Sequence, residues 1–160
     1  MGNDIVLSKN FLLSEFTHSD FAVKNGIQNI PSDEHVKNLK TLCEKILQPV
    51  RDKFGPLTIT SGFRSKALNE AIGGVYNSGH MSGNCADFTP STKSFKKLDI
   101  ALWIIKNLEF DQLILEKGDY KDPLWLHVAY NSKPRRQVYR FMNDSGYVAI
   151  SGDDITKYIS

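Results

Sequence analysis

Apolar residues recur at steps of three and four between about residues 33 and 53, and this spacing predicts an amphipathic helix. A serine followed by two acidic residues marks its start, and a glycine-proline pair at 55–56 marks its end. The apolar face would consist of Val36, Leu39, Cys43, Ile46 and Val50. The same spacing predicts a second helix over about 92–107, with an inner face of Phe95, Leu98, Leu102 and Ile105.

Alternating and β-branched stretches predict the strands. They lie at 57–63, 85–90, 110–116, 124–130 and 136–142. Short helices are expected over 64–74 and at about 19–25, the latter within an otherwise irregular N-terminal arm. The tail after about residue 143 has no readable pattern. This mixture predicts an α+β fold, with a small, mainly antiparallel sheet and helices packed on one side.

The composition is that of an ordinary globular protein. The chain has 160 residues, 41% of them hydrophobic and 24% charged, which fits one domain spanning residues 1–160 and argues against disorder. The net charge of +2 is too small to predict a nucleic-acid partner. No segment approaches the ~20 apolar residues that a membrane span needs, so no membrane insertion is expected. The two cysteines, Cys43 and Cys85, are expected to be reduced and buried.

Two separate stretches carry the candidate chemistry. "SGHMSGNCADF" at 78–88 holds His80 and Asp87, and "LWLHVAY" at 124–130 holds His127 within an alternating strand. Taken one at a time, each of these residues is usually structural: a satisfied histidine, a turn or a cap. Together they form a possible His/Asp/His set, which suits zinc because imidazole nitrogen and carboxylate oxygen are good zinc ligands, and three of them leave a fourth position for water.

Several motifs resemble those of the zinc D-Ala-D-Ala carboxypeptidase superfamily, most of all its short phage- and prophage-type peptidases, the carboxypeptidase C-terminal domain family. The motifs are "SGFRS" at 61–65, Asn69, "GG" at 73–74, "SGHMSGNCAD" at 78–87 and "WLH" at 125–127. The resemblance is strongest over about residues 10–130 and leaves the tail at 143–160 without a known role. It implies a fold of the hedgehog/DD-peptidase type.

The same resemblance implies roles for single residues. His80, Asp87 and His127 would bind zinc, and Arg64 and Ser78 would bind the substrate. The physical case for Arg64 is good, because a guanidinium can hold a peptide carboxylate through two parallel hydrogen bonds.

The chain departs from the family pattern at three positions. Phe63 stands where tyrosine is usual, and Cys85 stands where alanine is usual, but neither is a ligand position. Many relatives carry an acid three residues before the last histidine, and this chain has Leu124 there, which cannot transfer a proton. Glu116, at the end of the preceding strand, is therefore the first candidate for the general base, and Asp122 is the second.

The resemblance implies zinc-dependent hydrolysis of stem-peptide bonds in peptidoglycan, as a D-Ala-D-Ala carboxypeptidase or an endopeptidase. The N-terminus lacks an apolar run of signal-peptide length, so we expect a protein made in the bacterial cytoplasm without a signal peptide. A phage or prophage lysin would fit, acting on the cell wall after release or carried in a virion among other virion proteins. The alternative is a catalytically silent virion module, structural or wall-binding, that keeps the hydrolase fold.

Overall fold

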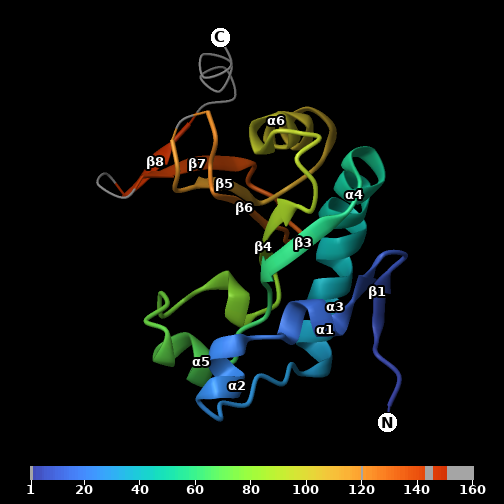
Figure 1. Cartoon of the computed structure of the whole chain (residues 1–160), viewed down its shortest axis with the longest axis vertical. Helices are drawn as coiled ribbons and strands as arrows, with labels where there is room; N and C mark the ends of the chain where they lie inside the picture. The colour runs from blue at the N-terminus through green and yellow to red at the C-terminus, as the bar shows by residue number, and fades with distance from the viewer. Residues whose placement is uncertain (1, 120, 143–145, 151–160) are drawn as a thin grey trace.

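A six-stranded sheet forms the centre of the described part of the chain. The computed structural model describes residues 2–119, 121–142 and 146–150, and its sheet has the order β3-β4-β6-β5-β7-β8 (Figure 1). The strands are β3 (Leu57–Ser61), β4 (Cys85–Pro90), β5 (Gln112–Glu116), β6 (Trp125–Ala129), β7 (Gln137–Met142) and β8 (Gly146–Ala149). Neighbouring strands are antiparallel except β5 and β7, which are parallel. The prediction of a mainly antiparallel sheet in a mixed fold is confirmed.

The predicted helix over 33–53 is one continuous helical rod. It consists of α3 (Asp33–Leu42), a π-helical turn η1 (Cys43–Leu47) and α4 (Gln48–Phe54). The Ser32 side chain accepts a hydrogen bond from the backbone N–H of His35 at its start, and Gly55, with φ +91°, follows its end. Its apolar face is buried, with no solvent exposure at Leu39, Cys43, Ile46 or Val50.

Helix α6 (Lys97–Asn107) begins later than predicted. The Ser91 backbone N–H donates to the carbonyl oxygen of Pro56 at 2.9 Å, and the chain bends over residues 91–95 before the helix begins. Phe95, expected on the inner helix face, therefore precedes the helix and is 44% exposed, with its ring 5.1 Å from that of Phe54. The expectation for Phe95 was wrong, because the periodicity continued beyond the true start of the helix.

Short elements surround the lower part of the sheet in Figure 1. Helix α2 (Asp20–Lys24) and helix α5 (Lys66–Ala71) match the two short helices predicted from the sequence. The N-terminal arm has more regular structure than expected, because β1 (Val6–Ser8), β2 (Phe11–Leu12) and α1 (Leu13–Thr17) also form. Strand β8 lies in the part of the tail that had no readable pattern, and residues 151–160 lie outside the described residues.

The two faces of the sheet have different compositions because side chains alternate along each strand. One face is apolar and joins the hydrophobic core that α3, α4 and α6 share, with buried Ala86, Phe88, Leu113, Leu115, Leu126 and Val128. The other face lines a pocket and carries Cys85, Asp87, Gln112, Ile114, Glu116 and His127. The pairing of the strands thus gathers the candidate residues on one surface. Among the described helices, none is both long and apolar enough to cross a membrane.

Candidate metal centre

His80 lies on a short 3₁₀ turn, η2 (Gly79–Met81), whose start is capped by Ser78. The ring is buried, and its Nδ1 lies 2.7 Å from the carbonyl oxygen of Gly62. A carbonyl oxygen only accepts hydrogen bonds, so Nδ1 carries a proton, and Nε2 is the ring nitrogen that is left for the cluster. That Nε2 atom faces Asp87, 3.5 Å from its Oδ2. An orienting bond of this kind is typical of metal-binding histidines.

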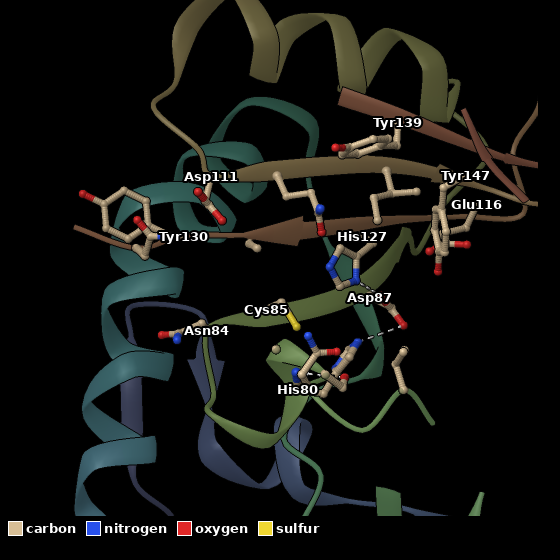
Figure 2. Close-up of a pocket in the computed structure, with 18 of the residues that line it drawn as sticks. His80, Asn84, Cys85, Asp87, Asp111, Glu116, His127, Tyr130, Tyr139 and Tyr147 are labelled. Carbon is tan, nitrogen blue, oxygen red and sulfur yellow. Dashed lines mark hydrogen bonds and ion pairs between the residues drawn. The ribbon is translucent and has the colours of Figure 1, made fainter. Parts of the chain in front are cut away.

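Asp87 and His127 meet because they are direct partners across β4 and β6. The Nδ1 atom of His127 lies 2.7 Å from Oδ1 of Asp87. The carboxylate therefore stands between the two imidazoles, with one oxygen toward each (Figure 2). The structure brings together all three residues that the sequence nominated as ligands, and their donor atoms are of the kinds that zinc prefers.

The charges in this cluster are strongly coupled. Burial alone would raise the pKa of Asp87, but the hydrogen bonds with His127 and His80 outweigh it and hold that pKa well below the usual range. Burial alone would lower the pKa of His127, but the Cys85 thiol and the Asp87 carboxylate raise it above its usual value. Negative charge is therefore favoured at Asp87, which suits a site for a cation.

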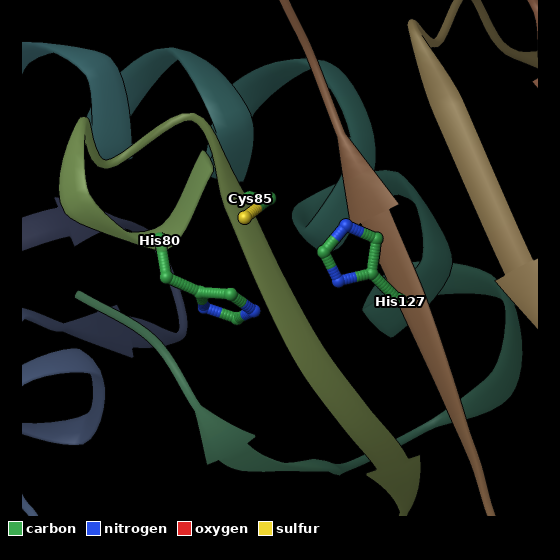
Figure 3. Close-up of side chains that lie close together, drawn as sticks. All are labelled: His80, Cys85 and His127. Atoms are coloured by element: carbon green, nitrogen blue, oxygen red, sulfur yellow. The ribbon is translucent and has the colours of Figure 1, made fainter. Parts of the chain in front are cut away.

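Cys85 also faces the cluster, which the sequence analysis did not foresee. Donor atoms of His80, Cys85 and His127 all lie within 4.8 Å of one another (Figure 3). The thiol is buried and free of any disulfide, as expected for both cysteines. The signal was present in the sequence, because Cys85 precedes Asp87 by two positions on a strand and so shares its face. Thiolate sulfur is a further zinc ligand type.

Glu116 ends β5 on the pocket face, opposite Trp125 of β6. Its side chain is buried, and burial together with the charge of Asp87 raises its pKa above the usual value. Asp122, the second candidate for the base, does not line the pocket. Its side chain is 73% exposed and forms an ion pair with Lys97 at 3.4 Å. Of the two candidates, the structure thus brings only Glu116 to the cluster.

Arg64 lines the same pocket and follows β3 in the chain. Its Nη2 donates to the Ser78 hydroxyl at 3.4 Å, and its backbone N–H donates to the His80 carbonyl oxygen at 3.1 Å. Within the described residues, Arg64 forms no ion pair, and its buried Nε has no hydrogen-bond partner. The guanidinium is therefore available to an anion that enters the pocket. Phe63, beside it, is buried against the ring of His35 at 4.7 Å.

The pocket that joins these residues has a volume of about 640 Å³, a size typical of ligand sites. One side carries the cluster, Glu116, Arg64 and Ser78. The segment that follows β6 supplies another part of the wall, including Tyr130, Asn131, Arg135, Tyr139 and Tyr147. None of these five residues was singled out from the sequence.

Comparisons with known proteins point in one direction. The sequence model of the peptidase M15 family matches residues 9–129. A curated relative, the zinc D-Ala-D-Ala carboxypeptidase of Streptomyces albus G, is 41% identical over 51 residues. That match covers 31% of this chain but only 20% of the relative, so it spans about a fifth of the relative's length.

Proposed function

Because the chain belongs to the peptidase M15 family, we propose that it is a zinc-dependent peptidase that hydrolyses stem-peptide bonds of peptidoglycan. The observation that carries the proposal is the shared pocket of a His/Asp/His cluster, a buried carboxylate at Glu116 and the unpaired guanidinium of Arg64. The proposal includes a fold of the hedgehog/DD-peptidase type.

The zinc ligands in this proposal are His80 through Nε2, Asp87 through its carboxylate and His127. A zinc ion bound there would lower the pKa of water and polarise the carbonyl group of the scissile bond. The hydrogen bond from His80 Nδ1 to the carbonyl oxygen of Gly62 turns Nε2 toward the cluster, so this ligand is oriented before any ion arrives.

Glu116 is the general base in this proposal. A carboxylate with a raised pKa takes a proton from the attacking water and returns it to the leaving amine more readily than an ordinary glutamate does. Its place at the end of β5 substitutes for the acid that many relatives carry at the position of Leu124. A base inside the pocket supports an active enzyme over a silent virion or wall-binding module.

Arg64 positions the substrate. Its guanidinium would hold the terminal carboxylate of a D-Ala-D-Ala stem, with Ser78 beside it, if the bond cut is the terminal one. An endopeptidase acting on internal bonds would depend less on this contact. We further propose that the protein is a phage or prophage lysin, made in the bacterial cytoplasm, that reaches the wall after release or in a virion.

The decisive experiment is zymography on purified peptidoglycan with mass analysis of the products. Glu116→Gln keeps the shape of the side chain but removes the proton acceptor, so we expect unchanged zinc content and a loss of turnover of ~10²-fold or more. Asp122→Asn is the matched control and should retain activity, because Asp122 lies outside the pocket.

Three results would change the assignment. Loss of turnover in Asp122→Asn with normal turnover in Glu116→Gln would reverse the choice of base. Normal turnover in both would assign the proton to another group. A zinc-loaded wild-type protein without turnover on any peptidoglycan would support the silent module.

A further inference from the structure

The hairpin of β7 and β8 lies beyond residue 129, where the match to the family ends, yet it extends the pocket face of the sheet. Two rows of side chains, each formed by residues opposite one another on neighbouring strands, run across the sheet and end on this hairpin. In the first, His127 of β6 is opposite Ile114 of β5, which is opposite Tyr139 of β7. Tyr139 therefore continues the row that begins at the metal cluster, and it lines the pocket.

The second row ends at Tyr147. Glu116 of β5 is opposite Phe141 of β7, which is opposite Tyr147 of β8. The ring centroids of Phe141 and Tyr147 lie 4.6 Å apart, so the two rings pack against each other. Tyr147 is 57% exposed and lines the pocket, and Figure 2 shows it beside Glu116.

The phenol of Tyr147 can donate a hydrogen bond. Among the residues that the structure describes, its hydroxyl has no hydrogen-bond partner. Burial and the charges of Glu116 and Asp87 raise its pKa, so the hydroxyl keeps its proton at neutral pH. A protonated phenol at the rim of a peptide-sized pocket is suited to a carbonyl oxygen of a bound ligand.

Arg64 and Tyr147 lie on opposite sides of the cluster. Arg64 follows β3 at one edge of the sheet, Tyr147 is on β8 at the other edge, and Asp87 and His127 lie on strands between them. Consider a peptide whose terminal carboxylate contacts Arg64 and whose scissile bond lies at the metal cluster. The residues upstream of that bond would then extend toward Tyr147.

We propose that Tyr147 is a substrate-binding residue supplied by a hairpin outside the family match: its hydroxyl donates a hydrogen bond to a backbone carbonyl of the peptide upstream of the scissile bond, and Tyr139 forms the adjoining aromatic wall. The proposal rests on the function proposed above and adds the site that would hold the upstream part of a stem peptide.

The test uses Tyr147→Phe, Tyr147→Ala and the matched control Tyr76→Phe, because Tyr76 is 88% exposed and does not line the pocket. Hydrolysis of a soluble stem pentapeptide is measured for each variant. Binding of the same peptide is measured by calorimetry in the Glu116→Gln background. A net hydrogen bond contributes about 0.5–1.5 kcal/mol, so Tyr147→Phe should lower kcat/KM and weaken binding by roughly 3- to 10-fold. Tyr147→Ala should cost more, because the ring contact is also lost.

Zinc content and melting temperature should be unchanged in Tyr147→Phe, which separates a contact with the peptide from a structural role. Both Tyr147 variants within twofold of their parents in hydrolysis and binding would overturn the proposal. If the parent protein binds the peptide without cutting it, the binding measurements alone test the role of Tyr147. If it neither binds nor cuts, the proposed function fails, and this inference fails with it.

Discussion

At the scale of single residues, Cys85 raises the question of which atoms hold the metal. Asp87 contacts both histidines, at 2.7 and 3.5 Å, and the Cys85 sulfur also lies with the two histidines in a group whose donor atoms are within 4.8 Å of one another. A fourth protein ligand would also close the position that a catalytic site keeps open for water. The ligand set proposed above therefore has Asp87 as the third ligand and Cys85 as a neighbour.

Cobalt substitution tests this ligand set, because thiolate coordinated to Co²⁺ absorbs in the near ultraviolet and carboxylate does not. We expect the cobalt-loaded protein to lack such a band, and Cys85→Ala to bind one metal ion with an unchanged affinity. Asp87→Ala should lose metal affinity by at least tenfold. A thiolate band in the wild type that disappears in Cys85→Ala would instead make Cys85 a ligand.

At the scale of elements, the N-terminal arm shapes the pocket through Asn29. Its Nδ2 donates to the carbonyl oxygens of Thr17 and Phe63, both at 2.9 Å, and its Oδ1 accepts from the backbone N–H of Ser65 at 2.6 Å. These bonds hold the backbone on both sides of Arg64. The N-terminal arm thus fixes the direction of the Arg64 side chain, although the two are far apart in the sequence.

Asn29→Ala should therefore weaken the contact between Arg64 and a terminal carboxylate of the substrate. We expect kcat/KM on peptides with a free terminal carboxylate to fall by about tenfold, which corresponds to about 1.4 kcal/mol, or roughly one net hydrogen bond. Peptides with an amidated C-terminus should be affected less, and zinc content should remain the same. Asn25→Ala, an exposed change in the same arm, is the control. An equal loss on both kinds of peptide would mean that Asn29 acts on folding and not on Arg64.

A second element-scale feature is the connection from β6 to β7, which passes the start of β5. The buried carboxylate of Asp111 accepts hydrogen bonds from Nε and Nη2 of Arg135, both at 2.9 Å, and from its backbone N–H at 3.1 Å. These bonds outweigh burial and hold the pKa of Asp111 below its usual value. The ion pair secures the crossing that allows β7 to run parallel to β5.

The pH dependence of stability follows from the sign of this shift. A carboxyl group with a lowered pKa in the folded state stabilises the fold above its unfolded pKa of about 4, and the contribution is lost as the pH falls through the folded value. Asp111→Asn should lower the free energy of unfolding by about 1–2 kcal/mol at pH 7, after allowance for the exposed Arg135. Denaturant titrations should show the difference from wild type narrowing below about pH 4. Glu44→Gln, an exposed change within η1, should show no such pH-dependent difference.

At the scale of the whole molecule, the sequence predicted the helices and strands that have a local pattern of apolar residues. Strand β6 alternates clearly and β4 is stopped by Pro90, so the positions of both strands and the shared face of Trp125 and His127 were readable. The meeting of His80 with His127 came from the family motifs, because distant segments leave no local signal of their contact. The parallel partner of β5 and the wall at Tyr147 were not readable, since the register between strands is set by tertiary pairing.

The division of the sheet into two faces also matters to anyone who wishes to redesign the protein. Core side chains such as Leu113 and Val138 alternate with pocket side chains such as Gln112, Ile114 and Tyr139 along the same strands. A combinatorial library restricted to the pocket positions would therefore sample new peptide specificities while leaving the packed interior as it is. The sheet thus separates the core side chains that folding requires from the pocket side chains that a library can vary.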